Sequence, residues 1–299
     1  MIKKRVFLVI SIIIAILIIG FVAYGIFAKP TRKAIEMAPR VEWNQEEIAR
    51  TLMQSLEKRR GPGEEAESAA TIESALEEPI LTREEVVDKG ILIAIDPGHQ
   101  AWEVDMSALE PNAPGSSNMK AKCTSGTSGR YSGLAEFQLN MDISLQLRTE
   151  LEQRGYQVLL VREDNQTAIS NAERATMASD AGAHAYIRIH ANSDNNSSVQ
   201  GALALVSSPT NPHVGHLYDE SYALAETILN AYCVETGFRN RGILQNDTMT
   251  GINWSRVPVM ILEMGFMSNE QDDLAMANPE FQSTMVQGIV NGIEQHFGY

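Results

Sequence analysis

Basic residues are scarce in the C-terminal two thirds of this sequence. The whole chain of 299 residues has 24 Lys and Arg against 38 Asp and Glu, a formal net charge of −14. Residues 91–299 hold 11 of the basic residues and 24 of the acidic ones, which gives this part a formal charge of −13. Nucleic-acid binding needs clustered cations that displace counterions from phosphates. The charge therefore argues against a nucleic-acid partner.

Cysteines are also few, and internal repeats are missing. Cys123 and Cys233 are the two cysteines of the chain, and the sequence is compatible both with a disulfide between them and with two free thiols. An apolar content of 44% over this length is enough for one sizeable core and an additional segment. We therefore expect one main domain with an appendage.

The appendage is visible as a long uncharged run near the N-terminus. Residues 6–28 are 23 consecutive uncharged residues, and as a helix they would cross roughly 30 Å of hydrocarbon. We therefore predict an N-terminal tail and a transmembrane anchor in residues 1–29. A cleavable signal peptide, which would leave a secreted protein, is the alternative. Its apolar region should span only about 7 to 15 residues, and residues 23–25 offer only a weak cleavage site.

The charges around this run do not set its orientation, because three basic residues precede it and three follow it closely. The short N-terminal tail favours an inside N-terminus. We thus expect a single-pass protein of the cell membrane whose C-terminal domain lies on the extracytoplasmic side.

Residues 30–81 have the composition of a linker or stalk. Residues 41–60 are helical in periodicity, with Ile48, Leu52 and Leu56 on one stripe. The following segment, residues 64–78, is acidic and poor in aromatics, as is typical of a solvated stalk. The stripe would suit a partner helix, but a solvated linker is the simpler interpretation.

The compact domain is predicted to cover residues 82–299. Thr82 and Glu85 form a capping-box pattern for a short helix that ends near Gly90. Apolar strand-like runs and helical periodicities then alternate along the chain. We predict strands at residues 91–95, 156–161, 185–189, 202–206 and 257–262, and helices at residues 134–154, 169–181, 216–236 and 279–297. This alternation predicts an α/β fold with a mostly parallel twisted sheet and helices on both faces.

Polar residues follow three of the predicted strands at the points where the strands end. His99 comes shortly after the first strand, while His190 and Glu263 directly follow two later ones. In open α/β sheets, functional sites form beyond the carboxyl ends of the strands. The two imidazoles and the carboxylate are therefore candidates for one common site.

A catalytic zinc takes three protein ligands and leaves a position open, so His99 and His190 need one partner. Glu136, in the first turn of a predicted helix, is the best candidate, because the Gly-, Ser- and Asn-rich loop at residues 100–133 can return it to the site. Glu263 would then be the general base. Each residue also has a structural alternative: the two histidines could be structural, Glu136 could be an acid that favours the helix dipole, and Glu263 could be half of a buried ion pair. These alternatives remain open, because no compact His-Glu-x-x-His motif occurs.

Four blocks of the sequence resemble a known family. They are Ile-Ala-Ile-Asp-Pro-Gly-His at residues 93–99, Gly-Leu-Ala-Glu at residues 133–136 with Asn140 one turn on, Arg-Ile-His-Ala-Asn at residues 188–192, and Pro-Val-Met-Ile-Leu-Glu-Met-Gly-Phe-Met-Ser-Asn at residues 258–269. The blocks resemble those of the zinc-dependent N-acetylmuramoyl-L-alanine amidases of bacterial cell walls, the amidase-3 type. They occur in the family's order over residues 91–299.

This resemblance implies Zn²⁺ held by His99, Glu136 and His190, with Glu263 as catalytic acid or base. The implied reaction is hydrolysis of the amide between the lactyl group of N-acetylmuramic acid and L-alanine in peptidoglycan. A peptidase that cuts within the stem peptide and a non-catalytic wall-binding or activator protein are the alternatives. The sequence does not identify a protein activator.

Three further residues lie beside the candidate ligands. Asn140, Arg188 and Asn192 are candidates for substrate binding or for orienting the site, although packing or turn roles are equally compatible with the sequence. The loop at residues 120–131 is a candidate for contacting glycan or gating access to the site.

Overall fold

A computed structural model describes residues 86–299 of the chain. The predicted anchor in residues 1–29 and the stalk in residues 30–81, with its helix, lie outside the described residues and stay predictions. Within the described part, none of the helices combines the length and the apolar character that a bilayer crossing needs.

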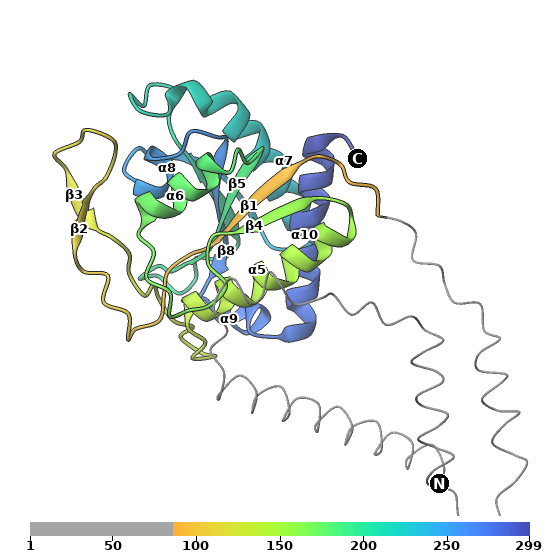
Figure 1. Ribbon diagram of the computed structural model, residues 1–299. Helices are drawn as coiled ribbons and strands as arrows, with labels where there is room; N and C mark the ends of the chain where they lie inside the picture. Colours follow the sequence, from red (N-terminus) through yellow and green to blue (C-terminus); the bar gives the residue numbers. More distant parts are fainter. Residues whose placement is uncertain (1–85) are drawn as a thin grey trace, which may run out of the picture. The chain divides into compact units, whose positions relative to one another are not determined.

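A six-stranded sheet forms the centre of the domain, in the order β4-β1-β5-β8-β6-β7 (Figure 1). Its strands are β1 (Leu92–Pro97), β4 (Gln157–Leu160), β5 (Ala185–Asn192), β6 (Ala202–Val206), β7 (Asn240–Gln245) and β8 (Val259–Phe266). All neighbouring strands are parallel except β6 and β8, which pair antiparallel. The prediction of a mostly parallel sheet is confirmed.

Helices cover both faces of this sheet, as predicted (Figure 1). The helices α5 (Glu136–Gln153), α7 (Tyr218–Thr236) and α10 (Pro279–Phe297) pack on one face. The helices α6 (Asn171–Asp180) and α8 (Thr250–Asn253), with the 3₁₀ turn η1 (Gly215–Leu217), pack on the other. The short helix α9 (Glu270–Met276) follows β8.

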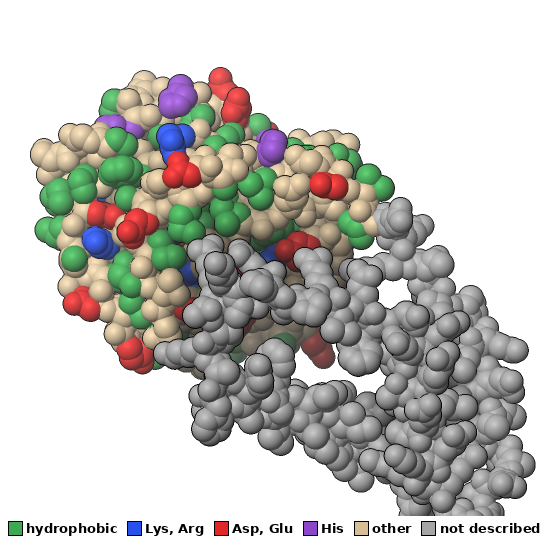
Figure 2. Space-filling view, viewed as in Figure 1, with side chains coloured by type: hydrophobic (Ala, Val, Ile, Leu, Met, Phe, Trp, Pro, Cys, Tyr) green, Lys and Arg blue, Asp and Glu red, His purple; other side chains and the backbone are tan. Residues whose placement is uncertain are grey.

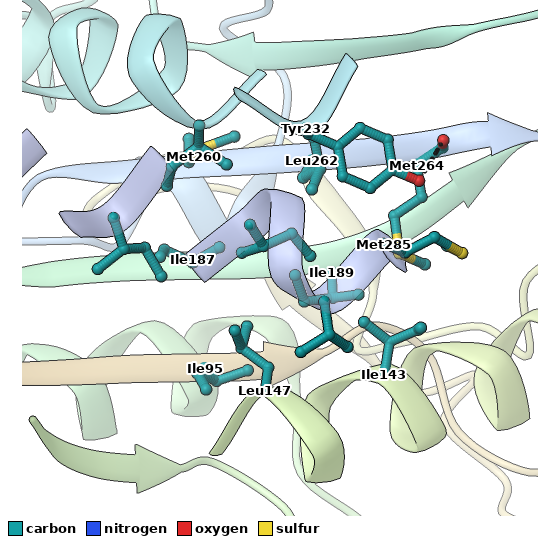
Figure 3. Packing of buried hydrophobic residues seen from close by; sticks show 14 of the residues in the cluster. Ile95, Ile143, Leu147, Ile187, Ile189, Tyr232, Met260, Leu262, Met264 and Met285 are labelled. Atoms are coloured by element: carbon teal, nitrogen blue, oxygen red, sulfur yellow. Dashed lines mark hydrogen bonds between the residues drawn. The ribbon is translucent and has the colours of Figure 1, made fainter. Parts of the chain in front are cut away.

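The strands are apolar on both sides because both faces of the sheet are covered. In β1, Ile93 and Ile95 face α5 and the larger core, whereas Ala94 belongs to the smaller core beneath α6. Figure 3 shows the larger core, where Ile187 and Ile189 of β5 lie between the side chains of β8 and those of α5. Continuous apolar runs in the sequence therefore correspond to buried parallel strands.

The helix boundaries follow local capping signals. The side chain of Ser170 accepts a hydrogen bond from the backbone N–H of Glu173, and the Glu173 side chain accepts one in return, which completes a capping box at the start of α6. The helix α10 starts with Pro279 after the N-cap residue Asn278, as the sequence indicates. The helix α7 begins at Tyr218, two residues later than predicted, because η1 occupies the preceding turn.

The prediction of a short helix ending near Gly90 is wrong for residues 86–90, the part of it that the structure describes. Residues 86–90 have no helical structure. The backbone N–H of Lys89 donates to the carbonyl of Gly155, and its ammonium group lies 4.1 Å from the ring centre of Tyr156 and 3.9 Å from that of Tyr299. These tertiary contacts hold the segment against the domain and outweigh the local capping pattern.

Several short elements were not predicted. The strands β2 (Leu109–Pro111) and β3 (Met119–Ala121) form an antiparallel hairpin inside the long loop, and β7, α8 and α9 are further additions. The hairpin lies to the side of the sheet, next to α6 (Figure 1). Both cysteines lie in the described part and are free thiols, which decides between the two readings of the sequence.

The surface agrees with the negative formal charge. The face seen in Figure 2 carries acidic side chains scattered among polar and hydrophobic ones, and the Lys and Arg side chains visible on it are isolated from one another.

Candidate metal centre

Three predicted ligand residues meet at the carboxyl edge of the sheet. His99 lies in the turn after β1, Glu136 is the first residue of α5, and His190 lies near the end of β5. Their donor atoms all lie within 4.8 Å of one another. Oε1 of Glu136 is 3.1 Å from Nε2 of His99 and 3.3 Å from Nδ1 of His190. The structure therefore brings together two imidazoles and one carboxylate from three separate elements.

The protonation states of this cluster suit a cation. Burial alone would raise the pKa of Glu136, but its hydrogen bonds with His190 and His99 outweigh that effect and hold the pKa well below the usual value. Burial lowers the pKa of His190 to about 4, so this imidazole is neutral at pH 7. Its Nε2 atom is buried and has no hydrogen-bond partner among the described residues. Two histidines and a glutamate form a known ligand set of catalytic zinc, so these residues fit the predicted ion.

The turn that carries His99 has an unusual backbone. His99 has a φ of 65°, and it is the sole non-glycine residue with positive φ among residues 86–299. A Cβ atom on the preceding residue, Gly98, would lie 2.3 Å from the ring of His190. Nδ1 of His99 lies 3.0 Å from Oγ1 and 3.1 Å from the carbonyl oxygen of Thr124. This contact turns Nε2 of His99 toward Glu136.

A strap formed by residues 124–127 runs along the candidate ligands His99 and Glu136. The backbone N–H of Thr127 donates to Oε2 of Glu136 over 2.9 Å. A Cβ atom on Gly126 would lie only 2.4 Å from the same carboxylate oxygen. On the other side, Nδ2 of Asn140 lies 3.4 Å from Oε1 of Glu136 and 3.3 Å from the carbonyl of Gly98. The carboxylate of Glu136 is thus oriented by contacts from both sides.

Glu263 lies beside these residues, because it is the register partner of His190 across β5 and β8. It is half-buried and lines a cavity of about 410 Å³ together with His99 and His190. Burial and, after it, the negative charge of Glu136 raise its pKa to about 8, against the opposing effect of Arg188. A carboxyl group with a raised pKa next to a candidate metal site is suited to proton transfer.

Residues 93–295 of the sequence match a family model described as N-acetylmuramoyl-L-alanine amidase. The chain belongs to this family. The family and the enzyme class that the four sequence blocks predict are confirmed.

Curated relatives and solved structures agree with this assignment. LytC of Bacillus subtilis, an N-acetylmuramoyl-L-alanine amidase, is 29% identical over 165 residues, which are 55% of this chain and 32% of LytC. The amidase Rv3717 of Mycobacterium tuberculosis is 27% identical over 214 residues, 68% of this chain and 85% of Rv3717. The crystal structure of the amidase Ami1 from Mycobacterium smegmatis, 25% identical, has a TM-score of 0.63 and covers 71% of this chain and 98% of its own.

The other candidate residues of this amidase domain have different positions. Asn140 contacts the candidate ligand Glu136, as described above. Arg188 is buried, lines the cavity, and donates to Oδ2 of Asp96 at 2.8 Å and to Oδ1 of Asn171 at 2.7 Å. Asn192 does not line the cavity. Its Oδ1 accepts a hydrogen bond from the backbone of Ser193, which is a turn contact.

A group of buried charged residues behind the candidate site was not predicted from the sequence. Asp96 is fully buried and accepts hydrogen bonds from Arg174 at 2.7 Å, from Arg188 at 2.8 Å and from the hydroxyl of Tyr186 at 2.7 Å. Arg162 is buried nearby. Two signals in the sequence could have indicated this group: Asp96 directly follows a predicted apolar strand, and Arg174 lies in an alanine-rich helix. Charged residues in such places need buried partners.

Proposed function

We propose that this chain is a zinc-dependent N-acetylmuramoyl-L-alanine amidase that hydrolyses the amide between N-acetylmuramic acid and L-alanine in peptidoglycan. The observation that carries the proposal is the convergence of His99, Glu136 and His190 next to Glu263, in a chain of this family. The three ligands would hold Zn²⁺, and Glu263 would handle the proton.

The zinc, when bound, supplies Lewis-acid chemistry that polarises the substrate carbonyl and acidifies the attacking water. Glu263 accepts the proton of that water and passes it to the leaving amine of L-alanine. Burial and the charge of Glu136 raise the pKa of Glu263 to about 8. A divalent cation held by His99, Glu136 and His190 would compensate this charge and lower the pKa of Glu263, so that its carboxylate form would be present at neutral pH.

The substrate also sets the location of the enzyme. Peptidoglycan lies outside the cytoplasmic membrane, so the catalytic domain would act on the extracytoplasmic side. The anchor predicted at residues 6–28 would hold it at the membrane surface.

Digestion of purified muropeptides tests the proposed reaction. The full chain is incubated with them in the presence and absence of a chelator, and the products are analysed by mass spectrometry. We expect free lactyl ends and new L-alanine amines only without the chelator. Cleavage within the stem peptide would support the peptidase alternative, and zinc binding without any cleavage would support a non-catalytic binding protein.

Two substitutions separate metal binding from proton transfer. Glu263→Ala should keep zinc but lower the turnover number by about 100- to 10,000-fold, because general acid–base catalysis contributes that much. His99→Ala should lose both zinc and activity, because it removes a ligand. Zinc content by atomic absorption and turnover of muropeptides are the measurements. A Glu263→Ala variant of full activity would contradict the role of Glu263.

A further inference from the structure

The turn that carries His99 presents three successive carbonyl groups to buried arginine side chains. They belong to Pro97, Gly98 and His99, at the point where β1 ends. Buried carbonyl groups need hydrogen-bond donors. The left-handed backbone of His99, with its φ of 65°, also needs surroundings that hold it, since this conformation costs a non-glycine residue about 1 kcal/mol or more.

Arg162 supplies donors to the first two carbonyls. It follows β4 and is buried, with 2% of its surface exposed. Its Nε donates to the carbonyl of Pro97 over 2.8 Å, and its Nη2 donates to that of Gly98 over 2.9 Å. Its remaining nitrogen, Nη1, donates to the carbonyl of Asp164 and to Oδ1 of Asn165. All three nitrogens of this guanidinium are therefore occupied.

Arg174 of α6 supplies the donor to the third carbonyl. Its Nη2 donates to the carbonyl of His99 over 3.0 Å, and its Nη1 donates to the carbonyl of Pro97 over 2.7 Å. Nη1 also pairs with Oδ1 of Asp96 at 2.7 Å, and neither side chain of this pair is exposed. Asp96 thus balances the charge of an arginine that reaches the metal-binding turn from behind.

We propose that Arg162 and Arg174 are positioning residues that hold the turn of His99 in the conformation that binds the metal. The inference rests on the proposed function, because it takes His99 as a zinc ligand. Arg188 provides the contrast: it pairs with the same carboxylate of Asp96 but donates to none of the three carbonyls.

Arginine suits this role better than lysine. A guanidinium group offers five N–H donors in a rigid plane, whereas an ammonium group is a single point of charge on a flexible stem. A lysine at position 174 would keep a cation for Asp96, but it would not span Asp96 and the carbonyl of His99 at the same time. Arg174→Lys and Arg162→Lys therefore remove the contacts to the turn while they retain the buried charge.

Zinc affinity of the full-length protein is the main measurement, determined by competition with a chromophoric chelator. Because partners of ligands typically change metal affinity by 10- to 100-fold, we expect affinities about 10-fold or more below that of the unchanged protein for Arg162→Lys and Arg174→Lys. The visible spectrum of the Co²⁺-substituted protein should also change, since it reports the ligand geometry. Arg154→Lys is the matched control, because Arg154 is partly buried and pairs with Glu150 and Glu294 rather than with the turn; it should retain the affinity and the spectrum.

Urea unfolding of the metal-free variants shows whether they fold. If Arg174→Lys does not fold, Arg162→Lys, which has no carboxylate partner to lose, carries the test. Unchanged affinity and Co²⁺ spectrum in the folded variants would overturn the inference, and so would an equal loss of affinity in Arg154→Lys. Absence of zinc binding by the unchanged protein would overturn the proposed function and this inference with it, so the two failures are distinguishable.

Discussion

Gly126 lies against the carboxylate of Glu136, in the strap of residues 124–127. Its φ of +77° is in the left-handed region, and a Cβ atom would also lie 2.8 Å from the ring of His99. Glycine is required there for two separate reasons, backbone conformation and space. The second reason links this residue to metal binding, because the atoms it would displace are those of two candidate ligands.

The substitution Gly126→Ala should lower zinc affinity by about 10-fold or more, since it must move the strap or the ligands that the strap orients. Gly133→Ala is the matched control, because Gly133 has a similar φ of +73° but nothing within 4 Å of the added atom. The control should lose only about 1 to 2 kcal/mol of unfolding free energy. Chelator competition and urea unfolding of both variants provide the comparison. Equal zinc affinities in both would show that the strap does not orient the ligands.

At the scale of the elements, α7 and α10 pack closely where α10 has two glycines. A Cβ atom on Gly292 would lie 2.4 Å from Cα of Ile228, and one on Gly288 would lie 2.8 Å from Cα of Tyr232. These neighbouring atoms belong to the backbone of α7, which cannot rotate away as a side chain can. The two helices cover the same face of the sheet, so their separation affects the packing of the larger core.

We expect Gly292→Ala to lower the free energy of unfolding by about 1 to 2 kcal/mol. Overpacking costs about 1 to 3 kcal/mol, and the higher helix propensity of alanine offsets up to about 1 kcal/mol of this. Ser283→Ala, at an exposed position of the same helix, should change it by less than about 0.5 kcal/mol. Urea denaturation at pH 7 measures both. A stabilised Gly292→Ala variant would mean that the helices separate at little cost.

The elements also determine how the long loop is arranged. The hairpin of β2 and β3 is held by the ammonium group of Lys120, which donates to the carbonyl of Thr248, and by Nε1 of Trp254, which donates to the carbonyl of Pro111 over 2.9 Å. Lys120 also lines the cavity that contains Glu263. The prediction that residues 120–131 contact glycan or gate the site remains to be tested, and a deletion that leaves turnover unchanged would contradict it.

For the molecule as a whole, the buried carboxylate of Asp96 links stability to pH. Burial opposes its ionisation, but the charges of Arg174 and Arg188 outweigh burial and hold the pKa of Asp96 well below its usual value. A group whose pKa is lowered by folding stabilises the native state above its unfolded-state pKa of about 3.9. This contribution is therefore present at neutral pH and is lost progressively as the pH falls below about 4 to 5.

Asp96→Asn should lower the free energy of unfolding at pH 7 by about 3 to 5 kcal/mol, because it leaves buried arginines without their carboxylate. It should also make stability less dependent on pH in the acid range. Asp180→Asn, which breaks an exposed pair with Arg256, should cost less than about 1 kcal/mol. Urea unfolding between pH 3 and pH 7 measures the free energy of unfolding of both variants. If the free energy of unfolding of Asp96→Asn fell with acid as steeply as that of the unchanged protein, other carboxylates would be responsible for the pH dependence.

The sequence alone determined the layer structure and the identity of the candidate ligands. Continuous apolar runs predict buried parallel strands, and His99, His190 and Glu263 stand at the predicted ends of three of these strands. In the structure, His99 follows β1, while β5 and β8 continue past His190 and Glu263 to Asn192 and Phe266. Glu136 is predictable from its place at a helix start and from the family resemblance. These features are local in the chain or repeat with a regular period, so they can be recognised without a structure.

Only the tertiary structure decided what holds these residues in place. The contacts of Arg162 and Arg174 with the turn of His99, and of residues 124–127 with Glu136, join segments that are distant in the chain or lie in irregular loops. Such contacts leave no periodic pattern in the sequence, and short elements such as β7 and α9 leave only a weak one. At residues 86–90, long-range contacts outweigh a local helix signal in the sequence. Local preferences amount to a few tenths of a kcal/mol to about 1 kcal/mol per residue, and buried partners can outweigh them.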